Sequence, residues 1–312
     1  MHGSDIGPVG TTGAVLPLDG QVIGGSGLLV RYLNLVKFPH TLFALPFALV
    51  GVVAAGTVAP VTGRLVVLVL VAFTAARWAA LAFNMIADRR FDAANPRNAQ
   101  RELPRGALTV GQAWGSMLAA SAVFLAAAAA INPLTRALGP VALAWVLTYS
   151  LTKRFTSLTQ LWLGLSLAIA PVGAWLAITG AWSDPWWVLC AIGTGVTCWV
   201  AAFDLFHALP DLEFDRSHGL RSLVTLLGRE RALWAARLLH AVALPMFALF
   251  GAGVGFRRWF AAALAVAAAL LASQHLLLAR RGTSAQPAIF FRLNALLSAT
   301  ILAGALLDRF LP

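Results

Sequence analysis

Charged residues are scarce in this sequence, and acidic residues are the scarcest of them. Only 11% of the 312 residues are charged, and 12 Asp and Glu residues stand against 23 Lys and Arg residues. A soluble globular protein carries about 25% charged residues. Because 60% of the residues are hydrophobic, the composition excludes an ordinary soluble domain and predicts an integral membrane protein.

Cysteine and histidine are too few and too scattered for the common metal and redox sites. The two cysteines, Cys190 and Cys198, lie in one apolar segment and form no CxxC pattern, and the six histidines form no HExxH motif. Neither structural zinc nor a disulfide framework is indicated. The net charge of +11 comes from arginines between apolar blocks, as the positive-inside rule requires, so we expect no nucleic-acid partner.

Long apolar segments dominate the remaining sequence. A block of about 20 apolar residues crosses a hydrocarbon layer of roughly 30 Å as a helix, and period-two alternation typical of a membrane barrel is absent. We predict an all-α fold, a polytopic bundle of about nine transmembrane helices. The predicted helices lie near residues 38–57, 64–87, 108–131, 137–152, 160–180, 186–206, 233–253, 258–279 and 287–310.

The longer connections carry most of the basic residues. They lie near residues 88–107, 153–159, 207–232 and 280–286, and the alternating short connections carry far fewer. The positive-inside rule therefore places the long connections in the cytoplasm, where 88–107 and 207–232 are expected to form a small cap.

The first 27 residues differ from the rest. They are rich in Gly, Ser and Thr, contain no Lys or Arg, and lack the pattern of a signal peptide. We expect residues 1–27 to be a disordered tail that precedes one membrane domain at 28–312.

Seven of the few acidic residues fall into two short stretches, each at the cytoplasmic end of an apolar segment. In the first, Asn84, Asp88 and Asp92 are spaced i, i+4, i+8, so a helix places all three on one face. The second has the spacing i, i+7, i+11, which also shares a face if Pro210 unwinds the helix little. Its members are Asp204, Asp211 and Asp215.

Two such carboxylate sets at one membrane depth would repel each other unless cations neutralise them. Ligand sets made only of oxygen suit Mg²⁺, which is commonly shared with phosphate oxygens. Nearby cations suit the phosphates themselves; they are Arg89, Arg90, Arg97, Lys153 and Arg154. The pattern predicts a diphosphate held by metal ions beside an apolar cavity. The alternative is that the acids only pair with neighbouring arginines in solvated loops.

At these residues the sequence resembles the UbiA superfamily of intramembrane prenyltransferases. Asn84, Asp88 and Asp92 match its first motif, and the second acidic set matches its D-x6-D-x3-D motif. The segment from Tyr149 to Arg154 is similar to its Y-x-x-x-K-R stretch. The order of motifs and the number of helices agree over nearly the whole chain outside the tail.

The resemblance implies a Mg²⁺-dependent transfer of a polyprenyl group from polyprenyl diphosphate to an electron-rich phenol, within the lipid bilayer of the bacterial cytoplasmic membrane. It implies one Mg²⁺ on the first motif and another on Asp211 and Asp215. Lys153, with Arg154 and Arg89, would stabilise the leaving diphosphate. Asp204 would orient the phenol or accept its proton, and Phe43, Phe83 or Phe203 would shield the allylic cation.

The acceptor is predicted to be a phenolic aromatic acid in quinone biosynthesis. Lys37, Arg31 and Arg77 supply cations near the cavity mouth that can pair with a carboxylate. Many 4-hydroxybenzoate members have Asp after the motif's Asn, whereas Met85 stands here, so both 4-hydroxybenzoate and a dihydroxynaphthoate stay open. The alternatives are a haem or lipid acceptor and, in another class, a secondary transporter, against which no internal repeat is found.

Overall fold

The computed structural model describes residues 23, 27–37, 41–286 and 288–311, and for residues 41–43, 290 and 291 only the backbone. The predicted disorder of the tail at 1–27 therefore falls outside the described residues, apart from Ile23 and Gly27. The side chain of Phe43 also lies outside them.

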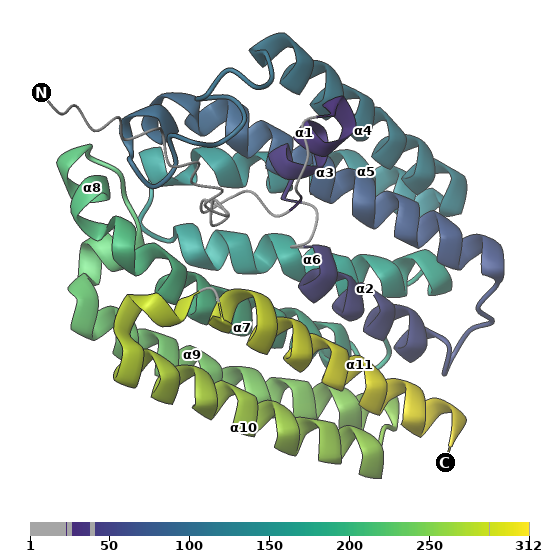
Figure 1. The fold of residues 1–312 in the computed structure, drawn as a ribbon. Coiled ribbons are helices and arrows are strands. Elements are labelled where there is room, and N and C mark those ends of the chain that lie inside the picture. Colours follow the sequence, from purple (N-terminus) through teal and green to yellow (C-terminus); the bar gives the residue numbers. More distant parts are fainter. Residues whose placement is uncertain (1–22, 24–26, 38–40, 287, 312) are drawn as a thin grey trace, which may run out of the picture.

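Every long regular element in the described chain is a helix (Figure 1). The prediction of an all-α membrane bundle is confirmed. The helices are α1 (Leu28–Leu35), α2 (Thr41–Ala55), α3 (Gly63–Ala94), α4 (Val110–Ile131), α5 (Pro133–Thr148), α6 (Thr159–Thr179), α7 (Trp187–Ala208), α8 (Leu212–Ser217), α9 (Leu223–Val254), α10 (Arg258–Arg281) and α11 (Asn294–Phe310). Short 3₁₀ turns occupy Tyr149–Arg154, Leu209–Asp211 and Gly282–Ala285, and a π-helical turn occupies Ala288–Leu293.

The nine predicted segments coincide with α2 to α7 and α9 to α11. Among the described residues, 7 helices are long and apolar enough to cross a membrane. The helices α2 and α11 are shorter, with 15 and 17 residues, so the count of about nine is approximate. Two helices were not predicted: α1 and α8, with 8 and 6 residues, are too short to show a reliable helical period.

Helix boundaries follow local caps more closely than hydrophobicity. Capping boxes at Thr109, Asn132 and Ser222 begin α4, α5 and α9, because each side chain satisfies a free backbone N–H. Helix α9 therefore starts ten residues before the predicted segment. Helix α3 runs on to Ala94, so the predicted loop 88–107 is helical in its first third and the loop spans residues 95–109.

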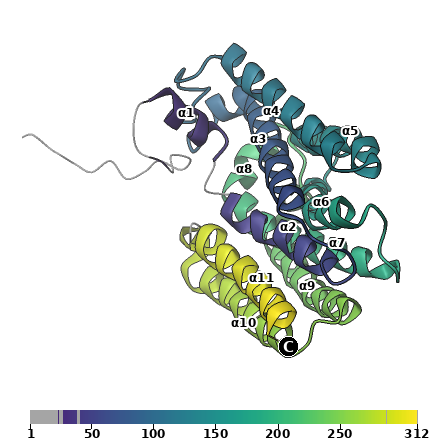
Figure 2. The same cartoon turned by 90° about the vertical axis from the view of Figure 1, so that its right-hand side faces the viewer.

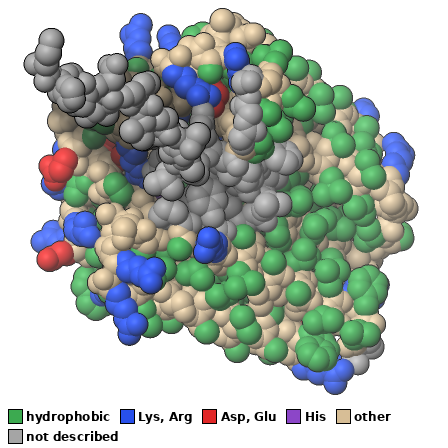
Figure 3. All heavy atoms as spheres, in the orientation of Figure 1, with side chains coloured by type: hydrophobic (Ala, Val, Ile, Leu, Met, Phe, Trp, Pro, Cys, Tyr) green, Lys and Arg blue, Asp and Glu red, His purple; other side chains and the backbone are tan. Residues whose placement is uncertain are grey.

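Six helices of the described chain form a ring. Helix α2 packs against α6 and α11, and the series α6, α7, α9, α10, α11 completes the ring (Figure 2). Helices α3, α4 and α5 pack on one another, and α5 rests on α6. Hydrophobic side chains spread over the right half of the face in Figure 3, and Lys and Arg side chains gather mainly on its left.

The long connections meet at one end of the bundle. Arg97 in loop 95–109 contacts both Asp211, after α7, and Gln286, after α10. Arg221 donates from Nη1 to the carbonyl of Phe155, 3.1 Å away. These contacts join all four connections that the charge pattern assigned to one side.

The short connections and the C-terminus share the opposite end. Arg309 donates to the carbonyl of Gly56 at 3.2 Å, and Asp308 accepts from the backbone N–H of Arg257 at 2.6 Å. The structure thus groups the connections into two ends as predicted.

Close helix contacts at glycine hold α6 in place. A Cβ added at Gly164 would lie 2.9 Å from Thr197 Cα on α7, and one at Gly51 would lie 2.9 Å from Pro171 Cα on α6. Backbones that approach this closely tolerate no side chain, a packing mode frequent between membrane helices. These contacts position α7, which carries part of the second acidic set.

We expect Gly164→Ala to destabilise the protein by about 1–3 kcal/mol, because the added methyl group overpacks the α6–α7 contact. Thermal unfolding of the purified protein in detergent measures the effect. Gly115→Ala on α4 is the matched control, since a Cβ there meets nothing within 4 Å. Equal stability of the two variants would contradict the close-packing argument.

Candidate active site

One cavity of about 790 Å³ occupies the space enclosed by α2 to α8. Its wall is mostly apolar, and its polar residues gather at the end where the long connections meet. The described residues of α9, α10 and α11 do not line it. These three helices therefore support the others, and the chemistry must come from the first two thirds of the chain.

The first acidic set lies on the cavity face of α3, as its spacing predicted. Asn84, Asp88 and Asp92 all line the cavity, and Asp88 and Asp92 are 5% and 4% exposed. Asn84 Nδ2 donates to Asp88 Oδ2 at 3.3 Å. The helix extension to Ala94 matters here, because it keeps both carboxylates on one regular helical face.

The second acidic set reaches the same cavity by an interrupted helix. Pro210 does break the helix: α7 ends at Ala208, and the 3₁₀ turn Leu209–Asp211 leads into α8. Asp204, Asp211 and Asp215 nevertheless all line the cavity. The predicted meeting of the two sets in one site is therefore present in the structure.

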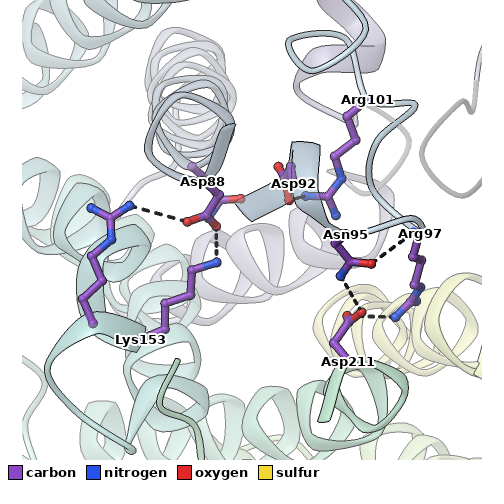
Figure 4. Close-up of polar contacts among 9 residues, drawn as sticks. Asp88, Asp92, Asn95, Arg97, Arg101, Lys153 and Asp211 are labelled. Atoms are coloured by element: carbon purple, nitrogen blue, oxygen red, sulfur yellow. Dashed lines mark hydrogen bonds and ion pairs between the residues drawn. The ribbon is translucent and has the colours of Figure 1, made fainter. Parts of the chain in front are cut away.

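Each of three carboxylates has a basic partner (Figure 4). Lys153 Nζ lies 2.7 Å from Asp88 Oδ2, and Arg101 Nη1 lies 2.8 Å from Asp92 Oδ1. Arg97 Nη1 lies 3.0 Å from Asp211 Oδ2. These partners come from two segments, the 149–154 turn and loop 95–109. The ion pairs therefore tie the turn to α3, and the loop to both α3 and the α7–α8 connection.

The cavity's polar end has oxygen atoms suited to a hard cation. Two buried oxygens, Asp88 Oδ1 and Asp92 Oδ2, have no hydrogen-bond partner among the described residues. A buried oxygen without a partner is costly, and carboxylate and amide oxygens are what Mg²⁺ prefers. The donor set therefore fits Mg²⁺. As the side chains stand, no three His, Cys, Asp or Glu residues of the described chain are grouped closely enough to hold one ion, so binding requires some carboxylates to exchange their basic partners.

Of the three cations predicted to stabilise the leaving diphosphate, only one lines the cavity. Lys153 lines the cavity, whereas Arg89 and Arg154 are not among the lining residues. Arg89 donates to the carbonyl of Ile86 on its own helix at 2.9 Å. Arg154 donates to the carbonyl of Ala87 at 2.6 Å and lies 3.8 Å from Asp88 Oδ1. Lys153 is therefore the best placed of the three.

Both predicted acceptor cations in the cavity wall, Lys37 and Arg77, do line it. Arg77 lies on α3 eleven residues before Asp88, which is about 16 Å along the helix axis. Arg31 instead donates to the carbonyl of Ala107 in loop 95–109 at 3.0 Å, so it holds α1 against that loop.

Two of the three predicted aromatic shields, Phe83 and Phe203, lie outside the cavity wall, and the side chain of the third, Phe43, is not described. Phe83 stacks edge-on against Trp114, and Phe203 against Trp199, and neither lines the cavity. The rings that do line it are Phe73, Phe91, Phe124, Trp145, Tyr149, Trp182 and Phe214. A helical sequence pattern identifies apolar faces but not which of several faces meets a cavity.

Two site residues were missed by the sequence argument. Asn95 Nδ2 donates to Asp211 Oδ1 at 3.1 Å, and Arg101 pairs with Asp92. Both lie in the polar stretch that follows the first motif, which is the signal that could have identified them. Their partners are visible only in three dimensions.

Loop 95–109 contains an internal ion pair with one buried partner. Arg105 Nη2 lies 2.9 Å from Glu102 Oε1, and Glu102 is buried. Burial raises the pKa of Glu102 above its ordinary value, while Arg105 opposes the rise. This pair is internal to the loop, whereas the contacts of Asn95, Arg97 and Arg101 with Asp211 and Asp92 hold the loop at the cavity's polar end.

Comparisons with known proteins find relatives over most of the chain. The UbiA prenyltransferase family matches residues 44–296. The 4-hydroxybenzoate octaprenyltransferase of Vibrio campbellii is 32% identical over 207 residues, which cover 66% of this chain and 71% of that protein.

Solved structures show the same fold. The apo structure of a UbiA homolog from Aeropyrum pernix K1 has a TM-score of 0.79 and 34% identity, covering 86% of this chain and 98% of its own. A UbiA homolog from Archaeoglobus fulgidus, bound to GPP and Mg²⁺, has a TM-score of 0.67 and 23% identity, covering 89% and 99%. The family match spans most of the chain, including every residue of both acidic motifs, and leaves no place for the transporter alternative. The chain belongs to the UbiA prenyltransferase family, and it is a membrane-embedded polyprenyltransferase.

Proposed function

We propose that this protein transfers a polyprenyl group from polyprenyl diphosphate to a phenolic aromatic acid, with Mg²⁺, at the cytoplasmic face of a bacterial membrane. The observation that carries the proposal is the single cavity shared by both acidic motifs and Lys153. The relatives named 4-hydroxybenzoate octaprenyltransferase favour 4-hydroxybenzoate as the acceptor. The homolog bound to GPP and Mg²⁺ supports the donor and the metal.

The polar end of the cavity would hold the diphosphate. Asn84, Asp88 and Asp92 would hold one Mg²⁺, and Asp211 and Asp215 a second. Bound Mg²⁺ would neutralise the diphosphate and make it a better leaving group. Lys153 would place its positive charge beside the oxygen that gains negative charge as the allylic C–O bond breaks.

The remaining lining residues would handle the organic groups. As the C–O bond breaks, its electron pair leaves with the diphosphate. A ring carbon ortho to the phenol hydroxyl then forms the new C–C bond to the allylic carbon. The ring loses one proton, for which Asp204, which lines the cavity, is the proposed base. The apolar wall keeps water from the allylic cation.

Lys37 and Arg77 are the proposed anchors for the acceptor carboxylate. They differ in depth, since Arg77 lies about 16 Å from Asp88 along α3. An ionic anchor fixes the ring and lowers KM for the acid. Met85, which lines the cavity beside Asn84, stands where many 4-hydroxybenzoate members have Asp, and it keeps the larger dihydroxynaphthoate as the second candidate.

We expect Lys37→Met or Arg77→Met to raise KM for the acid about tenfold or more, according to which cation is the anchor. The assay supplies octaprenyl diphosphate with 4-hydroxybenzoate, 1,4-dihydroxy-6-naphthoate or a phenol without a carboxylate, and identifies the products by mass. The phenol serves as the control, because its KM does not depend on the anchor. Transfer to the phenol as efficient as to either acid would refute the carboxylate anchor.

A further inference from the structure

The cavity is far longer than the diphosphate and the acceptor require. On α3 it is lined from Asp88 to Val69, and on α6 from Thr159 to Ala177. At 1.5 Å per residue these stretches are about 28 Å and about 27 Å long. Both helices therefore give a cavity length close to the hydrocarbon thickness of a bilayer, roughly 30 Å.

The deep part of the cavity is apolar and reaches the opposite end of the bundle. Beyond Arg77 its wall includes Val69 and Phe73 on α3 and Leu138 on α5. Trp182, in the connection between α6 and α7, lines the far end and is 50% exposed. A chain that enters at the polar end can therefore run the length of the bundle without meeting an acidic group.

Two glycines line this cavity, and they differ in the space around them. A Cβ added at Gly139 would lie 3.1 Å from Ala128 Cβ, so Gly139 serves the packing of α4 on α5. A Cβ added at Gly173 would meet only Ile169 Cγ2, at 4.0 Å, so Gly173 faces open space. Gly173 lies fourteen residues after Thr159, about 21 Å down α6 from the polar end.

We propose that the prenyl chain lies lengthwise in this cavity and that Gly173 keeps its deep half open, so that this position determines which chain lengths are accepted. The inference rests on the proposed function. An extended chain of backbone atoms advances about 1.2 Å per bond, as an extended polypeptide does. The whole cavity then holds roughly six isoprene units of four bonds each, and the stretch between the polar end and Gly173 holds roughly four.

The test replaces Gly173 by tryptophan, which fills the open space and closes the deep half. The chain of geranyl diphosphate, with two units, ends between the polar end and Gly173, whereas the chain of octaprenyl diphosphate extends past Gly173. We expect Gly173→Trp to lower the rate ratio of octaprenyl to geranyl transfer by at least about tenfold, because an obstructed apolar pocket discriminates strongly against added length. The measurement uses the purified full chain with 4-hydroxybenzoate and both donors.

Gly115→Trp is the matched control, because Gly115 is exposed on α4, lines no part of the cavity and has nothing within 4 Å. Its donor ratio should equal that of the wild type. Gly173→Leu provides the same test with a smaller side chain if the tryptophan variant does not fold. An unchanged ratio in a folded Gly173 variant would overturn the inference while leaving the transferase function in place.

Binding separates failure of the inference from failure of the proposed function. The rise in thermal stability caused by each diphosphate is measured for the wild type and the Gly173 variants in parallel. Loss of the octaprenyl response with retention of the geranyl response would support the inference even if no acceptor is prenylated. Retention of both responses would overturn it.

Discussion

Replacing Asp88 with asparagine is expected to lower prenyl transfer by at least about two orders of magnitude, since it removes a charged ligand from the proposed metal and diphosphate site. Asp88 is buried and is paired with Lys153 at 2.7 Å. The same loss is expected for Asp215→Ala on α8. Turnover of octaprenyl diphosphate with 4-hydroxybenzoate, measured with and without Mg²⁺, provides the readout.

A structural defect and a chemical defect must be told apart in this experiment. Breaking a buried ion pair destabilises a protein by about 3–5 kcal/mol, so thermal unfolding of Asp88→Asn is measured as well. Glu213→Ala is the matched control on α8. The side chain of Glu213 is 87% exposed, and its contact with Arg216 is long, at 3.9 Å between Oε1 and Nη1. Full transfer by the wild-type enzyme in EDTA would refute a site in which both acidic sets bind metal.

Replacing Lys153 with glutamine is expected to reduce kcat by roughly 10²–10³, or about 3–4 kcal/mol of transition-state stabilisation. The ammonium group opposes charge that develops only as the diphosphate leaves, so kcat should fall more than KM rises. Steady-state kinetics with saturating acceptor separate the two constants.

Arg154→Gln is the informative comparison for Lys153. The two residues are adjacent in sequence, but Arg154 does not line the cavity and donates to the carbonyl of Ala87. Its loss should change kcat far less than the loss of Lys153. A wild-type kcat in Lys153→Gln would show that Lys153 is only a positively charged loop residue that sets membrane orientation.

The ion pairs explain how the two readings of the acidic clusters relate. The sequence allows the carboxylates to be a metal site or to be partners of nearby arginines. The structure contains arginine and lysine pairs to Asp88, Asp92 and Asp211, yet these carboxylates line a cavity rather than a solvated loop. Because Asp88 and Asp92 each keep one buried oxygen without a hydrogen-bond partner, the paired carboxylates still offer oxygens to a cation, which would bind once some of the basic partners move away.

The sequence by itself determined the class of the fold and the two acidic sets that line the cavity. A scarcity of charge and nine apolar segments are local properties, and lipid allows few other structures for such segments. The spacing of Asn84, Asp88 and Asp92 likewise determines a shared face, because a single helix has a constant period. These features depend on neighbours within a few residues, so the chain reports them directly.

Only the tertiary structure decided which groups meet across the bundle. The pairing of Arg97 with Asp211, the exclusion of Arg89 and Arg154 from the cavity, and the open space at Gly173 all depend on how each helix is rotated against its neighbours. That rotation is set by close contacts between distant segments, such as Gly164 against Thr197 and Gly51 against Pro171. A helical pattern describes the faces of one segment and does not show which other segment packs on each face. The pattern of a single sequence therefore does not specify those contacts.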